Sequence, residues 1–168
     1  MDDNIRREML ALLPRLRRFA YGLTGSIDEG DDLVQATCER AIRHIGTWQP
    51  GTRLDSWMYR IARNTHFNTL RAKRVRADHV QSLDRDELSR VDGARAMEAH
   101  LTFTAVRDFI ARLPEDQRAV ILLVCVEGLA YKEVAEILDL PIGTVTSRLA
   151  RARLALKSFA EDPKSMES

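Results

Sequence analysis

Apolar residues recur three and four positions apart through the first half of the chain, which is the spacing of one face of an α-helix. This pattern predicts three helices, over residues 4–23, 26–45 and 54–76. Pro14 lies inside the first of them and can kink or divide it, and Gly22 and Gly25 are expected to close it. Ser26 and Glu29 have capping-box spacing, so the second helix is predicted to begin there.

The same periodicity returns near residue 100. It predicts four more helices, over residues 100–113, 115–127, 131–138 and 144–159. Pro114 and Gly128 separate the first three of these. The chain has no sustained alternation of apolar and polar residues, the pattern typical of half-buried strands, and its aromatic content is only 6%. The predicted fold class is therefore all-α.

Charge divides the chain into parts. Residues 1–77 hold 14 Lys and Arg against 9 Asp and Glu, whereas residues 78–100 hold 3 against 6 and are weakly periodic. We interpret residues 78–100 as an acidic linker between two small helical domains, residues 1–77 and 101–160, and residues 161–168 as a disordered tail. The net charge of +1 conceals a basic N-terminal half that is suited to contact phosphate.

Residues 131–156 have the features of a helix-turn-helix. Ala135 is a small residue where the two helices would cross, residues 139–143 supply a turn with Pro and Gly, and Thr144 is placed to cap the second helix. That helix would bury Val145, Leu149, Ala152 and Leu156. Its opposite flank carries Thr144, Ser147, Arg148 and Arg151, side chains that suit phosphates and base edges. An ordinary helical hairpin with solvated arginines is the alternative interpretation.

Other features limit the classes of function. Cys38 and Cys125 are in neither a metal-ligand nor a CxxC spacing, and their apolar surroundings predict reduced core thiols. No Gly-rich phosphate loop, nucleophile elbow or cluster of the four scattered histidines indicates an enzyme, a metal or a cofactor. The charged start and the lack of a long apolar run predict a cytoplasmic protein without membrane insertion.

Several runs of residues together resemble the extracytoplasmic-function (ECF) sigma factors of bacterial RNA polymerase. They are DDLVQA at 31–36, ERA at 39–41, LDSWMYRIARN at 54–64, LPEDQRAV at 113–120, LAYKEVAEIL at 129–138 and PIGTVTSRLARAR at 141–153. They occur in the order expected for this family and span nearly the whole chain. Asp139 stands where the family usually has Gly in the turn, and Thr146 where a basic residue is common.

The resemblance implies a function and a set of sites. Residues 1–77 would bind the β′ clamp of core RNA polymerase and the promoter −10 element, and residues 101–160 the −35 element. The β flap of the polymerase is a further implied partner. The implied clamp contacts are Asp32, Gln35 and Glu39. The implied −10 contacts are Arg60, Arg63, Asn64, Phe67, Arg71 and Arg74, with the loop 46–53 helping to hold a flipped base. The implied −35 contacts are Thr144, Thr146, Ser147, Arg148, Arg151 and Arg153.

An anti-sigma factor that covers the clamp surface, and a stress-responsive role, are also implied by the resemblance. Two other classes of protein stay open. A helix-turn-helix regulator that never binds polymerase would account for residues 101–160 but leave residues 31–76 unexplained. A sigma mimic that titrates an anti-sigma factor would bind that factor without supporting transcription, although such proteins usually carry a receiver domain, for which we see no room here. An enzyme is the class least supported by the residues.

Overall fold

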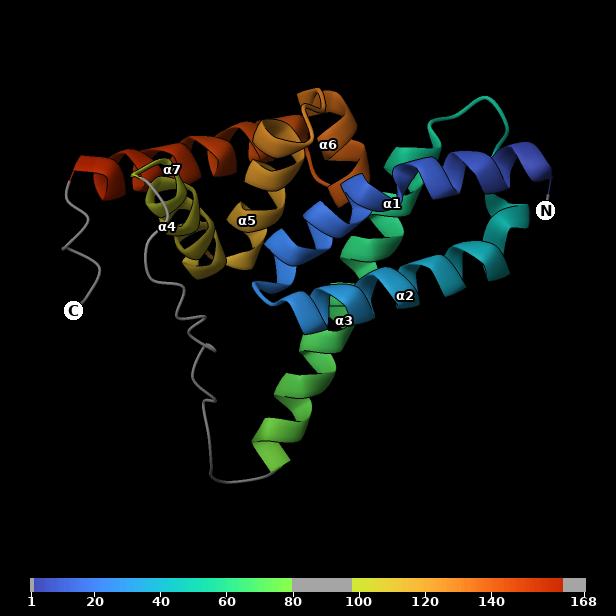
Figure 1. The fold of residues 1–168 in the computed structure, drawn as a ribbon, viewed down its shortest axis with the longest axis horizontal. Helices are drawn as coiled ribbons and strands as arrows, with labels where there is room; N and C mark the ends of the chain where they lie inside the picture. Colours follow the sequence, from blue (N-terminus) through green and yellow to red (C-terminus); the bar gives the residue numbers. More distant parts are fainter. Residues whose placement is uncertain (1, 80–97, 162–168) are drawn as a thin grey trace.

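The computed structural model describes residues 2–79 and 98–161, and these fold into helices and the turns between them (Figure 1). The elements are α1 (Asp3–Thr24), α2 (Ile27–His44), the 3₁₀ turn η1 (Ile45–Thr47), α3 (Leu54–His79), α4 (Glu98–Arg112), α5 (Glu115–Ile121), the π-helical turn η2 (Leu122–Val126), α6 (Tyr131–Leu138) and α7 (Ile142–Glu161). The all-α prediction is confirmed for these residues.

Helices α1, α2 and α3 form the N-terminal domain. The α2 N-terminus agrees with the prediction, because the Ser26 side chain accepts a hydrogen bond from the backbone N–H of Glu29. Gly30 allows α2 to approach α1 closely, since a Cβ at this position would lie 2.3 Å from Cδ1 of Tyr21. The core between these helices is built from Leu16, Phe19 and other buried apolar side chains of the predicted stripes.

Two expectations for the first helix are corrected. Pro14 does not divide α1, which continues to Thr24 and ends at Gly25 with a left-handed φ of 71°. Gly22 does not close the helix either. It lies inside α1, and a Cβ there would be 2.5 Å from Cδ2 of Leu122, so the absence of a side chain makes room for the other domain.

Helices α4 to α7 form the C-terminal domain, in which the most apolar run of the sequence becomes α5 and η2. The π turn shifts the backbone register: the N–H of Glu127 donates to the carbonyl of Leu122, five residues earlier, at 2.9 Å. Gly128 then reverses the chain with a φ of 68°. The π turn therefore determines the direction in which the Glu127 side chain leaves the domain.

The helix-turn-helix is present as α6 and α7. Asp139 adopts the left-handed conformation, with φ 54° and ψ 53°, which Gly adopts readily and Asp tolerates better than most other residues. The prediction that Thr144 caps the second helix is wrong. Helix α7 begins at Ile142, and the N–H of Thr144 donates to the carbonyl of Pro141, so Thr144 lies in the first turn.

The ends of the predicted linker and the cysteine environments also differ from expectation. Helix α3 extends to His79 and α4 begins at Glu98, while the rest of the predicted linker and the predicted tail beyond Glu161 lie outside the described residues. Cys38 is half-buried, but Cys125 is exposed. Within η2 it is Leu122 and Leu123 that occupy the core, so Cys125 faces away from it.

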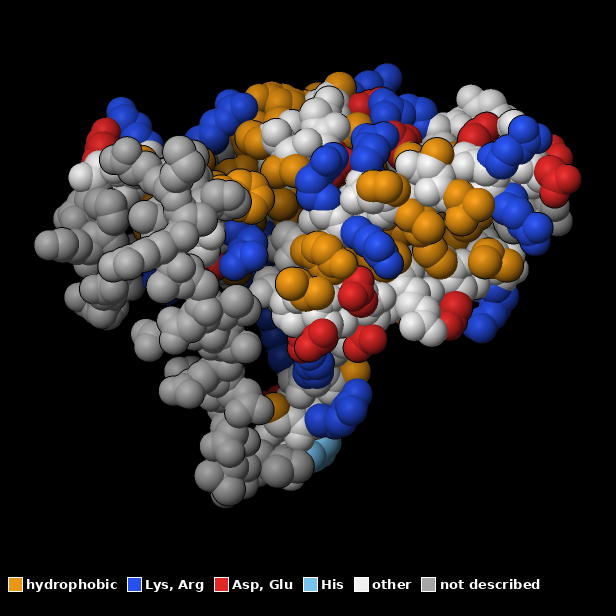
Figure 2. Space-filling view, in the orientation of Figure 1, with side chains coloured by type: hydrophobic (Ala, Val, Ile, Leu, Met, Phe, Trp, Pro, Cys, Tyr) orange, Lys and Arg blue, Asp and Glu red, His pale blue; other side chains and the backbone are white. Residues whose placement is uncertain are grey.

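The two domains pack directly against each other. Helix α1 contacts α4, α5 and η2, and α3 contacts α6, whereas the C-terminal turns of α3 project beyond the other helices (Figure 1). Apolar side chains also reach the surface over α1 and α2, among them Leu10, which is 59% exposed (Figure 2). The arrangement brings a basic helix of one domain against the helix-turn-helix of the other.

Candidate nucleic-acid interface

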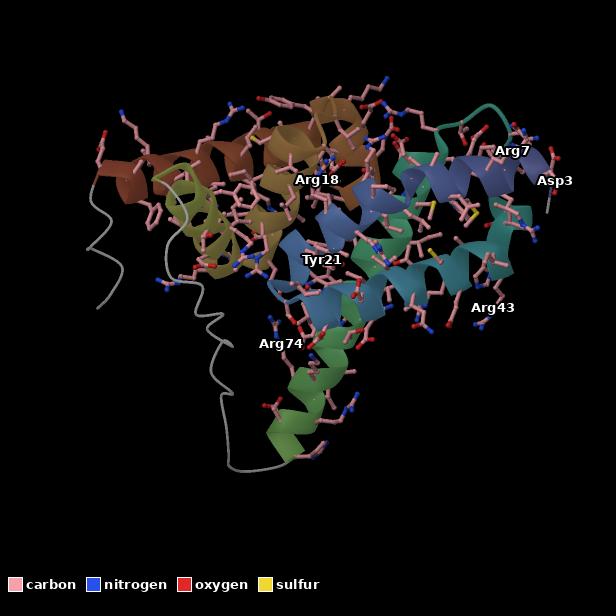
Figure 3. All side chains as sticks on the ribbon, viewed as in Figure 1. Asp3, Arg7, Arg18, Tyr21, Arg43 and Arg74 are labelled. Atoms are coloured by element: carbon pink, nitrogen blue, oxygen red, sulfur yellow. The ribbon has the colours of Figure 1, made fainter. Side chains whose placement is uncertain are left out.

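Helix α3 carries all six residues predicted to contact the −10 element. Arg60, Asn64, Arg71 and Arg74 are exposed, and Arg74 lies on the projecting part of the helix (Figure 3). Arg63 and Phe67 are half-buried, with the guanidinium carbon 4.7 Å from the centroid of the ring. The helix thus presents a row of cations with an aromatic ring among them, which suits a nucleic-acid backbone and unpaired bases.

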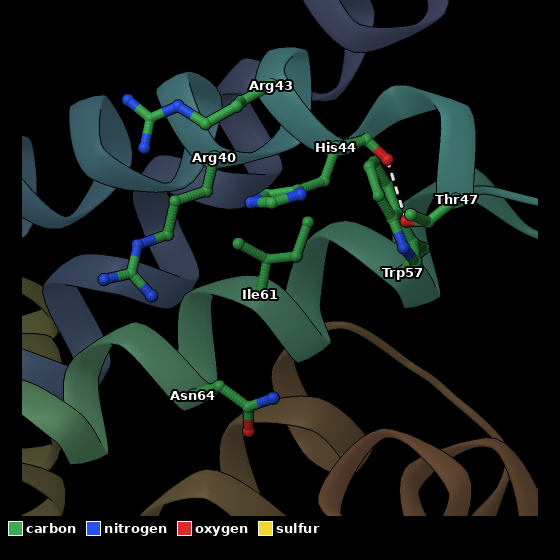
Figure 4. A pocket seen from close by; sticks show the side chains of 7 residues that line it. All are labelled: Arg40, Arg43, His44, Thr47, Trp57, Ile61 and Asn64. Carbon is green, nitrogen blue, oxygen red and sulfur yellow. Dashed lines mark hydrogen bonds between the residues drawn. The ribbon is translucent and has the colours of Figure 1, made fainter.

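A pocket of about 440 Å³ lies beside this row, between α2, η1 and α3 (Figure 4). Its lining is Arg40, Arg43, His44, Thr47, Trp57, Ile61 and Asn64. The Thr47 hydroxyl donates to the carbonyl of His44 at 2.7 Å and ties η1 to the end of α2. Trp57 is half-buried, packs against the core and forms part of the wall.

Sequence reasoning did not identify the three α2 residues of this pocket. Arg40, Arg43 and His44 were on the helix assigned to the polymerase clamp, and their spacing of three and four positions is the only signal that could have placed them together. All three are exposed. The pocket therefore combines cationic and aromatic groups, and Asn64 supplies an amide at its mouth.

Helix α7 carries the six residues predicted to contact the −35 element, but they do not share one face. Thr146, Ser147, Arg151 and Arg153 are exposed, while Thr144 and Arg148 are half-buried. Arg151 and Arg153 point to nearly opposite sides, at about 200° by the helical count of 100° per residue. Arg153 lies toward Cys125 and Tyr131 instead. Arg148 is ion-paired, with its Nε 3.4 Å from Oδ2 of Asp116.

The predicted clamp contacts are on the outer surface of α2. Asp32, Gln35 and Glu39 are all exposed, and the Gln35 amide donates to Glu39 Oε1 at 3.2 Å. These residues occupy one side of the helix, and Leu33, Val34 and Ala41 occupy the buried side. The surface is thus available to a partner while the helix keeps its core contacts.

The −10 face of α3 meets the helix-turn-helix. The Arg60 guanidinium donates to the carbonyl of Glu136 on α6 at 2.7 Å, and Arg53, just before α3, is ion-paired with Glu133. Burial lowers the pKa of Arg63; the charge of Asp139 opposes this shift and that of Arg148 adds to it. The predicted readers of the two promoter elements are therefore electrostatic neighbours.

Glu127 is the centre of the domain contact. Its side chain has no exposure, and it accepts hydrogen bonds from Arg18 at 2.9 Å through both Nε and Nη2, from the Tyr59 hydroxyl at 2.8 Å and from Arg15 Nε at 3.3 Å. Arg18 projects from α1 where it meets the C-terminal helices (Figure 3). Burial would raise the pKa of Glu127, but the hydrogen bonds from Arg18 and Tyr59 outweigh it and lower the pKa.

Arg118 makes a second link between the domains. Its guanidinium donates to the carbonyl of Leu23 on α1 at 2.6 Å, and also to three carbonyls of its own domain, those of Ile110, Ala111 and Leu113. Burial lowers the pKa of Arg118. The sequence did not indicate the roles of Arg118 and Glu127. Their partners in the other domain lie about 70 to 110 positions away in the chain, and no local pattern connects residues that far apart.

These features define a class of protein: helical, with two domains, and with a helix-turn-helix next to a basic helix. Comparison with known proteins gives the family. The model of Sigma-70, region 4 matches residues 103–156, and that of the Sigma2 domain of PhyR matches residues 9–63. The ECF RNA polymerase sigma factor EcfG of Rhodopseudomonas palustris is 36% identical over 159 residues, 95% of this chain and 86% of the relative. The chain belongs to the ECF RNA polymerase sigma factors.

Other relatives and solved structures agree with this assignment. The ECF RNA polymerase sigma-E factor of Haemophilus influenzae is 37% identical over 142 residues, 78% of this chain and 75% of the relative. The sigma factor RpoE of Bartonella quintana, in a co-crystal structure with the anti-sigma factor NepR, superposes with a TM-score of 0.77 at 27% identity, over 96% of this chain and 99% of that one. Among the residues described for this chain, no helix is long and apolar enough to span a membrane.

His66, buried where α3 faces α5, should make stability depend on pH. Burial lowers its pKa to about 4, against the usual 6.5 of a histidine, and the charge of Arg118 adds to the shift. Between these values the unfolded chain binds a proton that the native protein does not, so stability is full above about pH 6.5 and falls as pH drops toward 4, by roughly 2–3 kcal/mol.

Urea unfolding of wild type, His66→Gln and the exposed-site control His44→Gln across this pH range measures the effect. The difference between wild type and His66→Gln should change with pH, and by more than the difference between wild type and His44→Gln. Parallel pH profiles for wild type and His66→Gln would contradict the prediction.

Proposed function

We propose that this protein is an initiation factor that binds core RNA polymerase through α2 and reads the −10 element with α3 and the −35 element with α7. The observation that supports this most is the pocket beside the cationic row of α3, on the same chain as a helix-turn-helix. A helix-turn-helix regulator has no need of a second site suited to unpaired bases. The factor acts by binding, not by catalysis, and works in the cytoplasm.

The −10 site would hold one base outside the DNA stack. Extruding a base costs a few kcal/mol, and a preformed pocket offsets that cost with stacking and hydrogen bonds. In this protein Trp57 and Ile61 supply the apolar wall, and Asn64 can pair with a base edge. Arg40 and Arg43 at the rim are placed to contact the flanking phosphates.

The −35 site would be the N-terminal part of α7 in the major groove. Arg151 is exposed and can reach a guanine edge or a phosphate. Thr146 and Ser147 donate to carbonyls of their own helix, of Ile142 and Thr144, but their oxygens can still accept, which suits contacts to base amino groups. Arg148 must first leave Asp116 to take part.

We also propose that an anti-sigma factor holds this protein until a stress signal releases it. The support is the similar RpoE structure, which is a complex with the anti-sigma factor NepR. The acidic and polar residues Asp32, Gln35 and Glu39, on the same helix as the exposed apolar side chain of Ile42, offer a surface that such a factor and the polymerase clamp would compete for.

A sigma mimic is the second candidate, and one observation favours it: the N-terminal domain matches the model of the Sigma2 domain of PhyR. Transcription separates the two. Purified protein added to core polymerase should direct run-off transcripts from a promoter library, with core alone as the blank and a helix-turn-helix regulator as the control. Binding to an anti-sigma factor without any transcript would identify a mimic instead.

Removal of Arg151 should weaken −35 binding. If this side chain contacts a base, Arg151→Ala costs about 1–3 kcal/mol, on the order of a 5- to 150-fold loss of affinity for a −35 duplex selected with the wild-type holoenzyme. Lys157→Ala, an exposed cation further along the same helix, is the matched control and should bind like wild type. Equal affinity of Arg151→Ala and Lys157→Ala would rule out the assignment.

Asn64→Ala should weaken binding of the non-template −10 strand to the holoenzyme by roughly tenfold, since one base contact or stacking interaction is worth about 1–3 kcal/mol. Asn68→Ala is the control, because Asn68 is exposed on α3 but does not line the pocket. Oligonucleotides with one abasic position test which base is held: at the correct position the Asn64→Ala effect should disappear. An unchanged Asn64→Ala effect at every abasic position would disprove the pocket's role.

A further inference from the structure

We propose that Glu127 is the latch of a closed resting state, in which the C-terminal domain contacts the −10-reading face of α3 and must leave it before the promoter is read. The inference rests on the proposed function for the role of α3 in DNA binding. The latch itself rests only on the contacts between the domains.

The latch is built by an unusual backbone turn. The π turn η2 ends at Glu127, whose N–H donates five residues back to Leu122, and the N–H of Leu129 donates to Leu123 at 3.0 Å. Such turns are uncommon and frequently mark functional sites. Here the turn directs the Glu127 carboxylate out of its own domain and onto α1 and α3, where Arg18 and Tyr59 donate to it.

The contact is strong when closed and yet releasable. The Glu127 side chain has no exposure, whereas the side chains of Arg15 and Arg18 are 35% and 53% exposed. A buried carboxylate needs its donors, because without them its desolvation is unfavourable. If the domains part as a unit, water replaces these donors on both sides. Separation therefore leaves no buried charge unpaired, which is the property required of a reversible latch.

The closed state is incompatible with promoter reading for two reasons. Arg60 is held on the Glu136 carbonyl of the helix-turn-helix, so it is not free for phosphate. In addition, elements centred near −10 and −35 are about 25 base pairs apart, which is roughly 85 Å of duplex at 3.4 Å per base pair. Helices α3 and α6 are in contact, so the two readers cannot span that length without separating.

Close packing at Gly22 gives a second, independent way to test the contact between the domains. Gly22 of α1 lies against Leu122, and a Cβ at Gly22 would approach Cδ2 of that leucine to 2.5 Å. A larger side chain at Gly22 should therefore push the domains apart without altering any charge. Gly143, which like Gly22 lies inside a helix, offers a matched control, because a Cβ there meets nothing within 4 Å.

The test measures opening and DNA binding separately on the full chain. Opening is followed by energy transfer between dyes at introduced cysteines, Arg7→Cys and Lys157→Cys, with Cys38 and Cys125 replaced by Ser. DNA binding is followed with a single-stranded −10 oligonucleotide and no polymerase. The variants are Glu127→Gln and Gly22→Val, with Glu161→Gln and Gly143→Val as controls. Circular dichroism checks that each variant is folded.

Both Glu127→Gln and Gly22→Val should lower energy transfer and raise oligonucleotide affinity, on the order of tenfold, since apparent affinity scales with the open fraction. Both controls should match wild type. Unchanged energy transfer in folded Glu127→Gln would overturn the latch, whatever the DNA result. Opening without any gain in DNA affinity would instead leave the latch standing and overturn the DNA-binding role proposed for α3.

Discussion

A buried carboxylate determines how the two halves of this protein sit together. Glu127 is enclosed between α1, α3 and the turn that carries it, and it is stable there as an anion only because Arg15, Arg18 and Tyr59 converge on it. These three donors come from one domain and the acceptor from the other. The domain arrangement and the ionisation of this one group are therefore coupled, since neither is favourable without the other.

The same contact places the DNA-reading surfaces in competition. Arg60 and Arg63 suit nucleic acid because they are cations on an outward face, and for the same reason they suit the carbonyl of Glu136 and the charge of Asp139. A surface built to hold phosphate is thus satisfied internally when the domains meet. The pocket lined by Asn64 and Trp57 lies between α2 and α3 (Figure 4).

Local features of the fold were predictable, because each depends on residues a few positions apart. Short-range sterics and hydrogen bonding account for the helical segments, for the Ser26 cap and for the left-handed turn at Asp139. The errors have tertiary causes. Pro14 stays helical because buried side chains on both sides of it, such as Met9 and Leu16, hold α1 to the core. Gly22 is a packing site and not a helix end because Leu122 of the other domain lies against it.

The sequence alone determined the helices, the helix-turn-helix and the family, and with the family the surfaces on α2, α3 and α7 where partners are expected. Only the tertiary structure decided which of those surfaces are covered. It also decided that Arg40, Arg43 and His44 line a pocket with Asn64, and that Glu127 and Arg118 join the domains. The physical reason is the distance along the chain over which each interaction acts. Periodicity and capping depend on residues within one or two helical turns. The buried carboxylate of Glu127 pairs with donors about 70 to 110 residues away, and no local pattern indicates that pairing.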